Sequence, residues 1–468
     1  MPFITTHPRL KVHLSSRETV RNCAVADPGT PFSQWGGTLA RQHPFRCQAG
    51  DTRSQNRRCR EGDSEIASRA LGPLQGKDTS MQSHHNIMGL RRAALRALPR
   101  PIFDYLDGGA EDEIVLRRAT SAYDDIELLP KALVDLSAST HETQIFGRTI
   151  PFPLILAPTG LTRLFHKDAE VAVAEAANKA GLPYCLSTLG TTTMEEFARV
   201  TTAPRLFQIY IFKDRGLTEE FIARAQANQY DGLILTVDTL VAGKRERDLV
   251  NGLSLPPRLN ARTFLQFAAK PRWSLPALFG REFDFVNVAH RVAAMSDKQV
   301  PLHVYVAGQF DNSITWKDVE WLAARWKGPL AVKGILRAED ARQANECGAD
   351  TVMISNHGGR QLETAVAPID QIASVADAVG GRVKIICDGG IRRGSHIVKA
   401  LALGADACSI GRPYLYGLAS GGASGVSRAL DIMREEYERS MALLGAATPR
   451  DLKPSMLKRV GRPASSAC

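Results

Sequence analysis

The chain has 468 residues, of which 44% are hydrophobic and 23% charged, a composition ordinary for a soluble globular protein with a large core. No stretch approaches the roughly 20 consecutive apolar residues of a membrane-spanning helix, so none is predicted. The formal net charge of +10 is compatible with nucleic acid, an anionic membrane surface or acidic small molecules, and does not choose among them.

The eight cysteines form no CxxC motif and have no paired spacing with histidine. Cys185, Cys387 and Cys408 lie inside apolar runs, where cysteine usually behaves as a small buried hydrophobe. The N-terminus also lacks the continuous apolar segment of a secretory signal. We therefore expect a cytoplasmic, reducing environment, with no disulfide framework and no metal site.

Residues 1–80 differ in composition from the rest of the chain. They contain 12 Lys and Arg against 7 acidic residues and show neither helical nor strand periodicity. Such a segment cannot bury enough apolar surface to offset its chain entropy, so we expect a disordered basic extension. Two alternatives are a targeting segment and a start codon assigned too far upstream, with Met81 or Met88 opening the functional chain.

From about residue 84 the sequence becomes regular. A helical pattern over 85–99 is stopped by Pro99 and Pro101, and short apolar runs then alternate with amphipathic helical segments. The predicted strands are 153–160, 184–190, 206–210, 233–238, 330–334, 351–355, 384–390 and 407–411. The predicted helices between them include 167–181, 338–350 and 394–406.

The eight predicted strands are continuously apolar rather than alternating, which indicates burial on both faces and a parallel sheet. Eight strand–helix units predict an α/β fold of the TIM (β/α)8 barrel type. A doubly wound open sheet is the alternative, but no GxGxxG motif follows the first strand.

A long insertion follows the fourth predicted strand. About 90 residues separate 233–238 from 330–334, and they include the apolar and aromatic stretch "FLQFAAKPRWSLPALFG" with basic residues around it. Two interpretations are open: a lid that packs on the barrel, or a peripheral membrane contact through residues 264–281.

Polar and cationic residues follow nearly every predicted strand. Because the carboxyl ends of barrel strands meet at one face, these residues should line one active site. Lys333 ends an apolar strand, where an unpaired charge is costly, so a partner is expected. Glycines with Arg392 and Arg412 after the last two strands match the usual phosphate site of such barrels.

These stretches together resemble one family. "FDYLDGGAED", "LAPTG", "LST", "FQIY", "TVDT", "GKRERD", "VKGI", "SNHGGRQL", "DGGIRRG" and "GRP" occur in the order found in the FMN-dependent α-hydroxy acid dehydrogenases and oxidases. The resemblance runs from about residue 84 to 455. The expected organisation is an extension over 1–80, a barrel domain over 81–455 and a tail over 456–468.

The resemblance implies a role for each matching residue at the substrate. His357 would take the substrate proton, and Asp238 would stabilise the resulting imidazolium. Arg360 would be the main clamp on the substrate carboxylate, with Arg245 nearby. Tyr105 and Tyr210 would bind the carboxylate and the hydroxyl oxygen.

The resemblance also implies FMN as the cofactor. Lys333 would stabilise the negative charge of the reduced flavin. The other residues expected to bind FMN are Ala157, Pro158, Thr159, Ser187, Gln208, Thr236, Ser355, Asp388, Gly389, Gly390, Arg392, Gly411 and Arg412.

Three positions depart from the pattern of glycolate oxidase. Leu189 stands in place of a pocket tryptophan, which disfavours glycolate and resembles the lactate-oxidising flavocytochrome. Gly160 stands where oxidases carry alanine, as in the dehydrogenases. Glu363 replaces an aspartate and affects no assigned role. The expected reaction is oxidation of an L-2-hydroxy acid, L-lactate first, with (S)-mandelate dehydrogenation and an oxygen-using oxidase as alternatives.

The expected partners follow from the same resemblance. No haem-binding domain is evident, so a quinone or another carrier is the expected electron acceptor, reached at the inner face of the cell membrane. A homotetramer is expected from the family. A nucleic-acid-binding protein with an inert barrel is disfavoured, because His357 and Lys333 are present and the basic extension has few aromatic residues among its arginines.

Overall fold

The computed structural model describes residues 79–252, 261–281, 283–294, 306 and 308–460. Contacts divide the chain into two units, Met1–Leu74 and Gln75–Cys468. The expectation of a disordered extension falls almost entirely on residues outside the described part. Everything below concerns the second unit.

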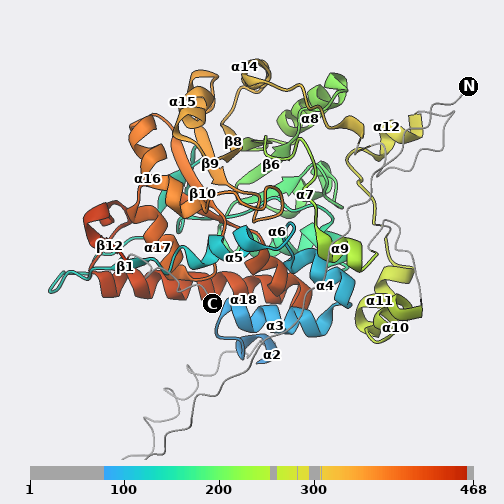
Figure 1. Cartoon of the computed structure of the whole chain (residues 1–468), viewed down its shortest axis with the longest axis horizontal. Helices are drawn as coiled ribbons and strands as arrows, with labels where there is room; N and C mark the ends of the chain where they lie inside the picture. The colour runs from blue at the N-terminus through green and yellow to red at the C-terminus, as the bar shows by residue number, and fades with distance from the viewer. Residues whose placement is uncertain (1–78, 253–260, 282, 295–305, 307, 461–468) are drawn as a thin grey trace, which may run out of the picture. The chain divides into compact units, whose positions relative to one another are not determined.

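Eight parallel strands close into a barrel (Figure 1), in the order β10-β11-β4-β5-β6-β7-β8-β9. The barrel strands are β4 (Leu154–Leu156), β5 (Tyr184–Ser187), β6 (Arg205–Ile209), β7 (Gly232–Thr236), β8 (Leu330–Ile335), β9 (Thr351–Ser355), β10 (Lys384–Asp388) and β11 (Ala407–Ile410). Each lies within or overlaps a predicted run. Because β11 pairs with β4, the sheet has no open edge, and the doubly wound alternative is wrong.

The barrel interior explains why the strand sequences are continuously apolar. One residue from each strand fills the lower part of the barrel, and the hairpin of β2 (Thr143–Ile145) and β3 (Arg148–Ile150) closes that end with Ile145, Phe146 and Ile150. A second, larger cluster fills the space between the strands and the helices outside them. Both faces of each strand are therefore buried, and an alternating pattern has no place in such a sheet.

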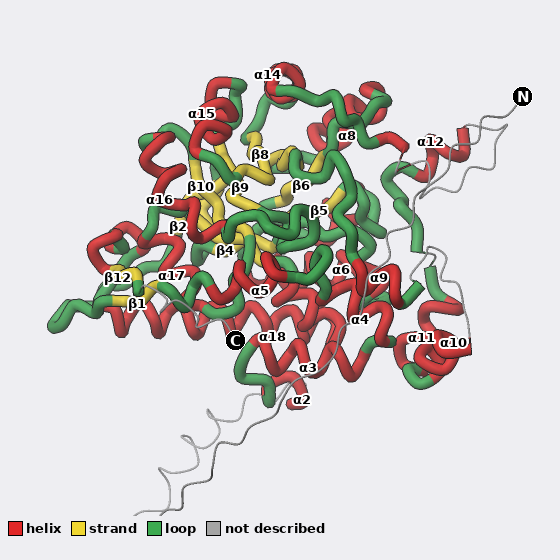
Figure 2. The backbone as a smooth tube through the Cα atoms, in the orientation of Figure 1, coloured by secondary structure: helices red, strands yellow, loops and turns green. Residues whose placement is uncertain are grey.

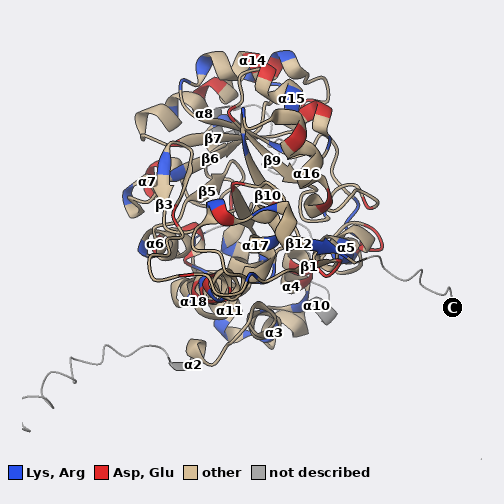
Figure 3. Cartoon of the chain, turned by 90° about the vertical axis from the view of Figure 1, so that its left-hand side faces the viewer, with Lys and Arg blue, Asp and Glu red and all other residues tan. Residues whose placement is uncertain are grey.

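Helices surround the barrel (Figures 1 and 2). They are α6 (Ala169–Ala180), α7 (Met194–Val200), α8 (Arg215–Ala227), α14 (Trp316–Arg325), α15 (Ala338–Glu346), α16 (Pro368–Val379), α17 (Gly394–Ala402) and α18 (Arg412–Leu444). Figure 3 shows Lys, Arg, Asp and Glu mainly on these outer helices, while the strands are mostly uncharged. This is the distribution that burial of the strands requires.

Within the described residues, four helices precede the barrel: α2 (Thr79–Gln82), α3 (Ile87–Ala97), α4 (Arg100–Asp107) and α5 (Ile114–Ser121). Helix α3 packs against α18, so the predicted first helix becomes part of the outer layer. Helix α4 lies near α9 and brings Tyr105 to the carboxyl end of the barrel.

The long insertion lies between β7 and β8, as predicted. Its described part contains α9 (Glu246–Val250), α10 (Ala261–Ala268), α11 (Pro271–Phe279) and α12 (Ala289–Ala294), followed by α14. Its contacts with the barrel include a bridge between Phe212 and Phe310 and a hydrogen bond from Trp273 Nε1 to the Leu164 carbonyl at 2.8 Å. No helix in the described ranges is both long and apolar enough to cross a membrane.

The folded part continues beyond the predicted boundary at residue 455. Strand β12 (Leu457–Arg459) pairs antiparallel with β1 (Ile126–Leu128). Its sequence, Leu-Lys-Arg, is mostly polar because the strand lies on the surface, where the backbone ladder with β1 and an ion pair between Arg459 and Asp370 hold it. The motifs that carry the resemblance end before this strand, so the expected boundary left it in the tail.

Candidate active site

A cavity of about 430 Å³ opens at the carboxyl ends of the barrel strands. Its lining includes nearly all of the residues singled out from the sequence, namely Tyr105, Ala157, Pro158, Thr159, Gly160, Ser187, Leu189, Gln208, Tyr210, Thr236, Arg245, Lys333, His357, Arg360, Asp388, Gly389, Gly390, Arg392, Gly411 and Arg412. Asp238 and Ser355 do not line it but bond to residues that do. The barrel thus gathers at one face residues that lie between positions 105 and 412 of the chain.

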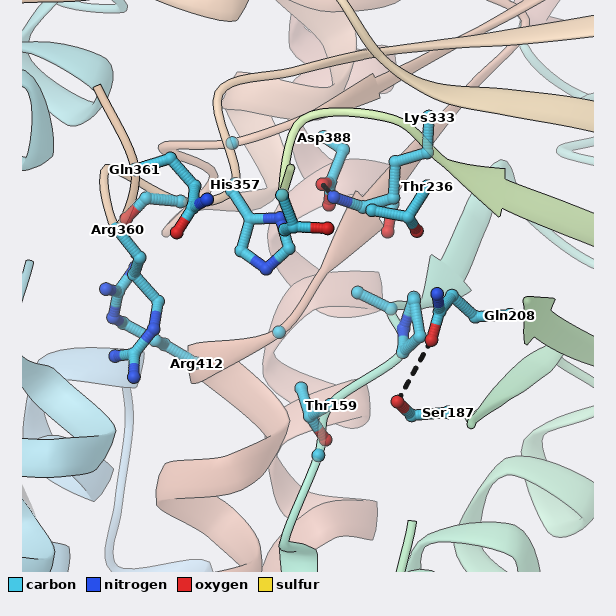
Figure 4. A pocket seen from close by; sticks show the side chains of 18 of the residues that line it. Thr159, Ser187, Gln208, Thr236, Lys333, His357, Arg360, Gln361, Asp388 and Arg412 are labelled. Carbon is cyan, nitrogen blue, oxygen red and sulfur yellow. Dashed lines mark hydrogen bonds and ion pairs between the residues drawn. The ribbon is translucent and has the colours of Figure 1, made fainter. Parts of the chain in front are cut away.

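The central feature is a histidine–carboxylate pair. His357 Nδ1 lies 2.9 Å from Asp238 Oδ1, which leaves Nε2 for the cavity (Figure 4). Burial raises the pKa of Asp238, but the charges of His357 and Lys333 outweigh it, so the pKa is below its usual value. Asp238 is therefore ionised and can stabilise an imidazolium.

The loop after β9 holds His357 in an unusual backbone conformation. His357, Gly358 and Gly359 have φ values of +54°, +64° and +74°, so three successive residues are left-handed. A Cβ on Gly359 would lie 2.8 Å from the Leu116 Cα, so no residue with a side chain fits at this position. A histidine in this region is strained, and such strain is typical of functional sites.

Lys333 has the partners that a buried cation requires. Its Nζ donates to Ser355 Oγ at 2.9 Å and lies 3.1 Å from Asp388 Oδ2, while Ser355 donates to the same carboxylate oxygen at 2.8 Å. Burial lowers the pKa of Lys333, but the negative charges of Asp388 and Asp238 raise it by more, so the pKa lies above its usual value. Lys333 thus remains charged at the cavity wall, where Figure 4 shows it directed toward Asp388.

Two arginines lie over the ring of Tyr105. The guanidinium carbons of Arg360 and Arg245 are 5.0 and 5.8 Å from the ring centroid. Arg360 Nη1 donates to the carbonyls of Tyr105 and Gly108, and Arg245 Nε lies 2.8 Å from Asp248. Burial lowers the pKa of Arg360, and the nearby charge of Arg245 adds to this, so a bound anion would relieve both effects.

Arg412 lies beside Arg360 in Figure 4, but its bonds are to the backbone. It donates to the carbonyls of Leu106, Gly108 and Gly358 at 3.2, 2.7 and 2.8 Å. Burial lowers its pKa to about 10. Besides lining the cavity, Arg412 therefore ties α4 to the loop that carries His357, a bracing role that the sequence did not indicate.

Several lining residues were missed by sequence reasoning. Phe165 and Phe310 are aromatic walls: Phe165 stacks on Tyr105 with centroids 6.1 Å apart, and Phe310 packs edge-on against Tyr210 at 5.0 Å. Burial and the charge of Asp238 raise the pKa of Tyr210 to about 12, so it stays a hydroxyl donor. Phe310 comes from the far end of the insertion, and no local pattern marks it.

Comparisons with known proteins agree on one family. The model of the FMN-dependent dehydrogenase family matches residues 94–459. The chain belongs to this family. An L-lactate dehydrogenase of Yersinia pestis is 41% identical over 371 residues, which cover 78% of this chain and 96% of that protein.

Solved structures point the same way. The monotopic membrane protein (S)-mandelate dehydrogenase has a TM-score of 0.76 and 36% identity, covering 81% of this chain and all of that one. A mandelate oxidase variant with (S)-mandelic acid has a TM-score of 0.68 and 33% identity, with coverage of 81% and 100%.

The polar atoms that line the cavity suit FMN, the cofactor of the family. Gln208 Nε2, Thr236 Oγ1 and Ser409 Oγ are buried cavity-lining atoms without a hydrogen-bond partner. Buried donors and acceptors are rarely left unpaired, so a ligand with ring carbonyl and N–H groups would satisfy them. Gln208 Oε1, in contrast, already accepts from Ser187 Oγ at 3.0 Å.

Proposed function

We propose that this FMN-dependent dehydrogenase oxidises an L-2-hydroxy acid, L-lactate first, to the corresponding 2-oxo acid. The observation that carries the proposal is the His357–Asp238 pair, 2.9 Å apart, whose histidine lines the same cavity as Arg245 and Arg360. A base beside an anion clamp is the arrangement that a hydroxy acid requires. Bound FMN would supply the two-electron acceptor for this chemistry.

Each side chain has a role in the proposed reaction. Arg360 and Arg245 bind and orient the substrate carboxylate, and Tyr105 and Tyr210 donate hydrogen bonds to the carboxylate and the hydroxyl oxygen. His357 Nε2 accepts a proton from the substrate, and the carboxylate of Asp238 stabilises the imidazolium that results.

The cofactor would be held around the same cavity. Ser187, Gln208, Thr236 and the segment Ala157–Thr159 would bind the flavin ring, with Lys333 supplying positive charge beside it. The remaining candidates, which would bind the ribityl chain and the phosphate, are Ser355, Asp388, Gly389, Gly390, Arg392, Gly411 and Arg412.

Two substrates with different side chains are candidates, L-lactate and (S)-mandelate. The relatives named L-lactate dehydrogenases favour lactate. The aromatic walls Phe165 and Phe310, together with Leu189, favour an aromatic acid such as (S)-mandelate. Both predict L-configuration at the hydroxyl carbon.

The electron acceptor is proposed to be a quinone or another carrier rather than oxygen. Gly160 supports this assignment, because the oxidases of the family carry alanine at this position and the dehydrogenases carry glycine. An oxidase remains the alternative reading of the same fold.

A peripheral membrane contact through residues 264–281 is part of the proposal. Five large apolar side chains of α10 and α11 are exposed, with Leu278 at 74% and Phe279 at 85% of their full surface. Exposed apolar groups beside basic residues suit a membrane interface. The likeness to a monotopic membrane dehydrogenase supports this contact.

Anaerobic titration of the FMN-loaded protein tests the function. Bleaching of the flavin absorbance by L-lactate or (S)-mandelate, but not by the D- or R-acid, is expected. Slow recovery in air would favour a dehydrogenase and fast recovery an oxidase, while no bleaching by any 2-hydroxy acid would contradict the proposal. Analytical ultracentrifugation of the same sample tests the expected homotetramer.

A further inference from the structure

A second cavity of about 650 Å³ lies beside the active site. Its walls come from α11, the end of α3, the loop 163–167 after β4 and the kink of α18 at Gly421. It shares one residue, Phe165, with the active-site cavity. Its lining is strongly basic and includes Arg96, Arg163, His166, Lys167, Lys270, Arg272 and Arg281.

Arg163 is the notable member of this set, because it is only 8% exposed. Its guanidinium donates to the carbonyls of Lys167 at 2.6 Å and Thr191 at 3.0 Å, and its Nε has no hydrogen-bond partner. Among the described residues no carboxylate lies within ion-pair distance of it. Burial lowers the pKa of Arg163, and the charge of Glu170 only partly offsets this. A buried charge without an anion is costly, which indicates that an anion is missing.

The rim of the cavity has more positive than negative charge. Lys167 and Arg281 lie 3.2 and 2.9 Å from Asp168 and Glu196, so these two cations are already paired. Lys270 donates to the Arg96 carbonyl at 2.5 Å, a neutral acceptor. For Arg272, as for the Arg96 guanidinium, no carboxylate of the described segments is within 4 Å. The unpaired cations therefore surround the buried one.

The apolar surface next to the cavity indicates where an anion would come from. Leu275, Leu278 and Phe279 are exposed on α11, the helix whose Arg272, Trp273 and Pro276 line the cavity. An anion that arrives with acyl chains attached would place its charge in the cavity and its chains against these side chains.

We propose that this cavity binds the phosphate of an anionic phospholipid head group, with Arg163 at its base and Arg96 and Arg272 at its rim. The assignment to a lipid rests on the membrane contact proposed above, whereas the anion site itself does not. The site is separate from the one that binds the hydroxy acid.

Two measurements on the full-length, FMN-loaded protein test the proposal. Inorganic phosphate should raise the melting temperature more than chloride at equal ionic strength, because it binds the folded state. Vesicles of phosphatidylglycerol and phosphatidylcholine should bind the protein more tightly than phosphatidylcholine alone. Loading with FMN fills the flavin phosphate site, so it cannot account for the first effect.

Variants locate the effects. Arg96→Gln with Arg272→Gln should abolish the phosphate-specific shift in melting temperature and weaken binding to the anionic vesicles by about tenfold or more. Arg337→Gln with Arg342→Gln removes the same charge from exposed side chains and should change vesicle binding by no more than about twofold. Arg163→Lys should reduce the phosphate-specific rise in melting temperature. A lysine cannot donate to the carbonyls of Lys167 and Thr191 and also reach the anion.

The double variant Leu278→Ser with Phe279→Ser tests the membrane contact independently of the anion site. It should abolish vesicle binding and leave the effect of phosphate on the melting temperature unchanged. Equal shifts with phosphate and chloride would overturn the anion site, even if vesicles still bind through the apolar side chains. A phosphate shift without any preference for anionic vesicles would overturn the assignment to a lipid.

Discussion

His357 combines a base, a carboxylate partner and a left-handed backbone at one position. Its Nδ1 lies 2.9 Å from Asp238, its φ is +54°, and the two glycines that follow also have positive φ. This backbone conformation and the bond to Asp238 together orient Nε2 toward the cavity. The left-handed conformation of a histidine costs free energy, and such a cost is typical of functional sites.

Replacing His357 by Gln should lower the rate of flavin bleaching by the hydroxy acid by about 10²–10⁴-fold, since that is the usual contribution of a general base. Stopped-flow absorbance measures this rate. FMN binding should persist, because the buried polar atoms that fit the ring lie on other residues. His290→Gln, at an exposed histidine on α12, is the matched control. A His357 variant with the rate of the parent protein would remove the base from the proposed reaction.

Asp238 should make stability depend on pH in one direction. Because its folded pKa is depressed, its contribution to the free energy of unfolding is fully present above the unfolded pKa of about 3.9 and is lost as pH falls through the folded value. The difference in free energy of unfolding between the parent protein and Asp238→Asn should be constant above about pH 5 and shrink below about pH 4. Urea denaturation across this range measures it. A difference that grows toward low pH would contradict the assigned ionisation.

At the scale of elements, β12 shows how a surface strand closes the domain. Besides its ladder with β1, the Leu129 N–H donates to the Met456 carbonyl and the Val460 N–H to the Asp125 carbonyl, at 2.8 and 2.9 Å. These bonds tie the end of the chain to the segment that precedes the barrel.

Removing residues 456–468 should therefore lower the free energy of unfolding by about 1–3 kcal/mol, at roughly 1 kcal/mol for each of a few net hydrogen bonds. Removing only 461–468 is the control and should change it little. Chemical denaturation of both truncated chains distinguishes them. Equal stabilities would mean that β12 contributes nothing.

The insertion between β7 and β8 has features that fit both interpretations made from its sequence. Phe310, near its end, packs against Tyr210 and lines the active site, as a lid residue would. Helices α10 and α11 expose apolar side chains and border the second cavity, as a membrane contact would. One segment can do both, because its two ends lie at different places on the barrel.

At the scale of the whole molecule, every residue lining the active-site cavity lies between Tyr105 and Leu415. Residues 1–74 contribute no group to this lining. A chain lacking residues 1–74 should thus keep its flavin spectrum and its rate of bleaching within about twofold, since no group of the site is removed. Absorbance spectroscopy and stopped-flow kinetics of the shortened and full-length proteins test this. Loss of FMN on truncation would contradict it.

The sequence by itself determined the barrel, its strand positions and most of the cavity lining. It could do so because buried parallel strands are continuously apolar and because a barrel brings the end of each strand to one face. Lys333 is an example: its place at the end of an apolar strand predicts both its burial and its need for a partner.

Only the tertiary structure decided the rest. Phe310 at the active site, Arg412 bonded to the backbone, β12 on the surface and the basic cavity around Arg163 all depend on contacts between segments far apart in the chain. Such contacts leave no periodic pattern, because each partner is placed by a different part of the fold. An unpaired buried charge, in particular, can be recognised only when its neighbours in space are known.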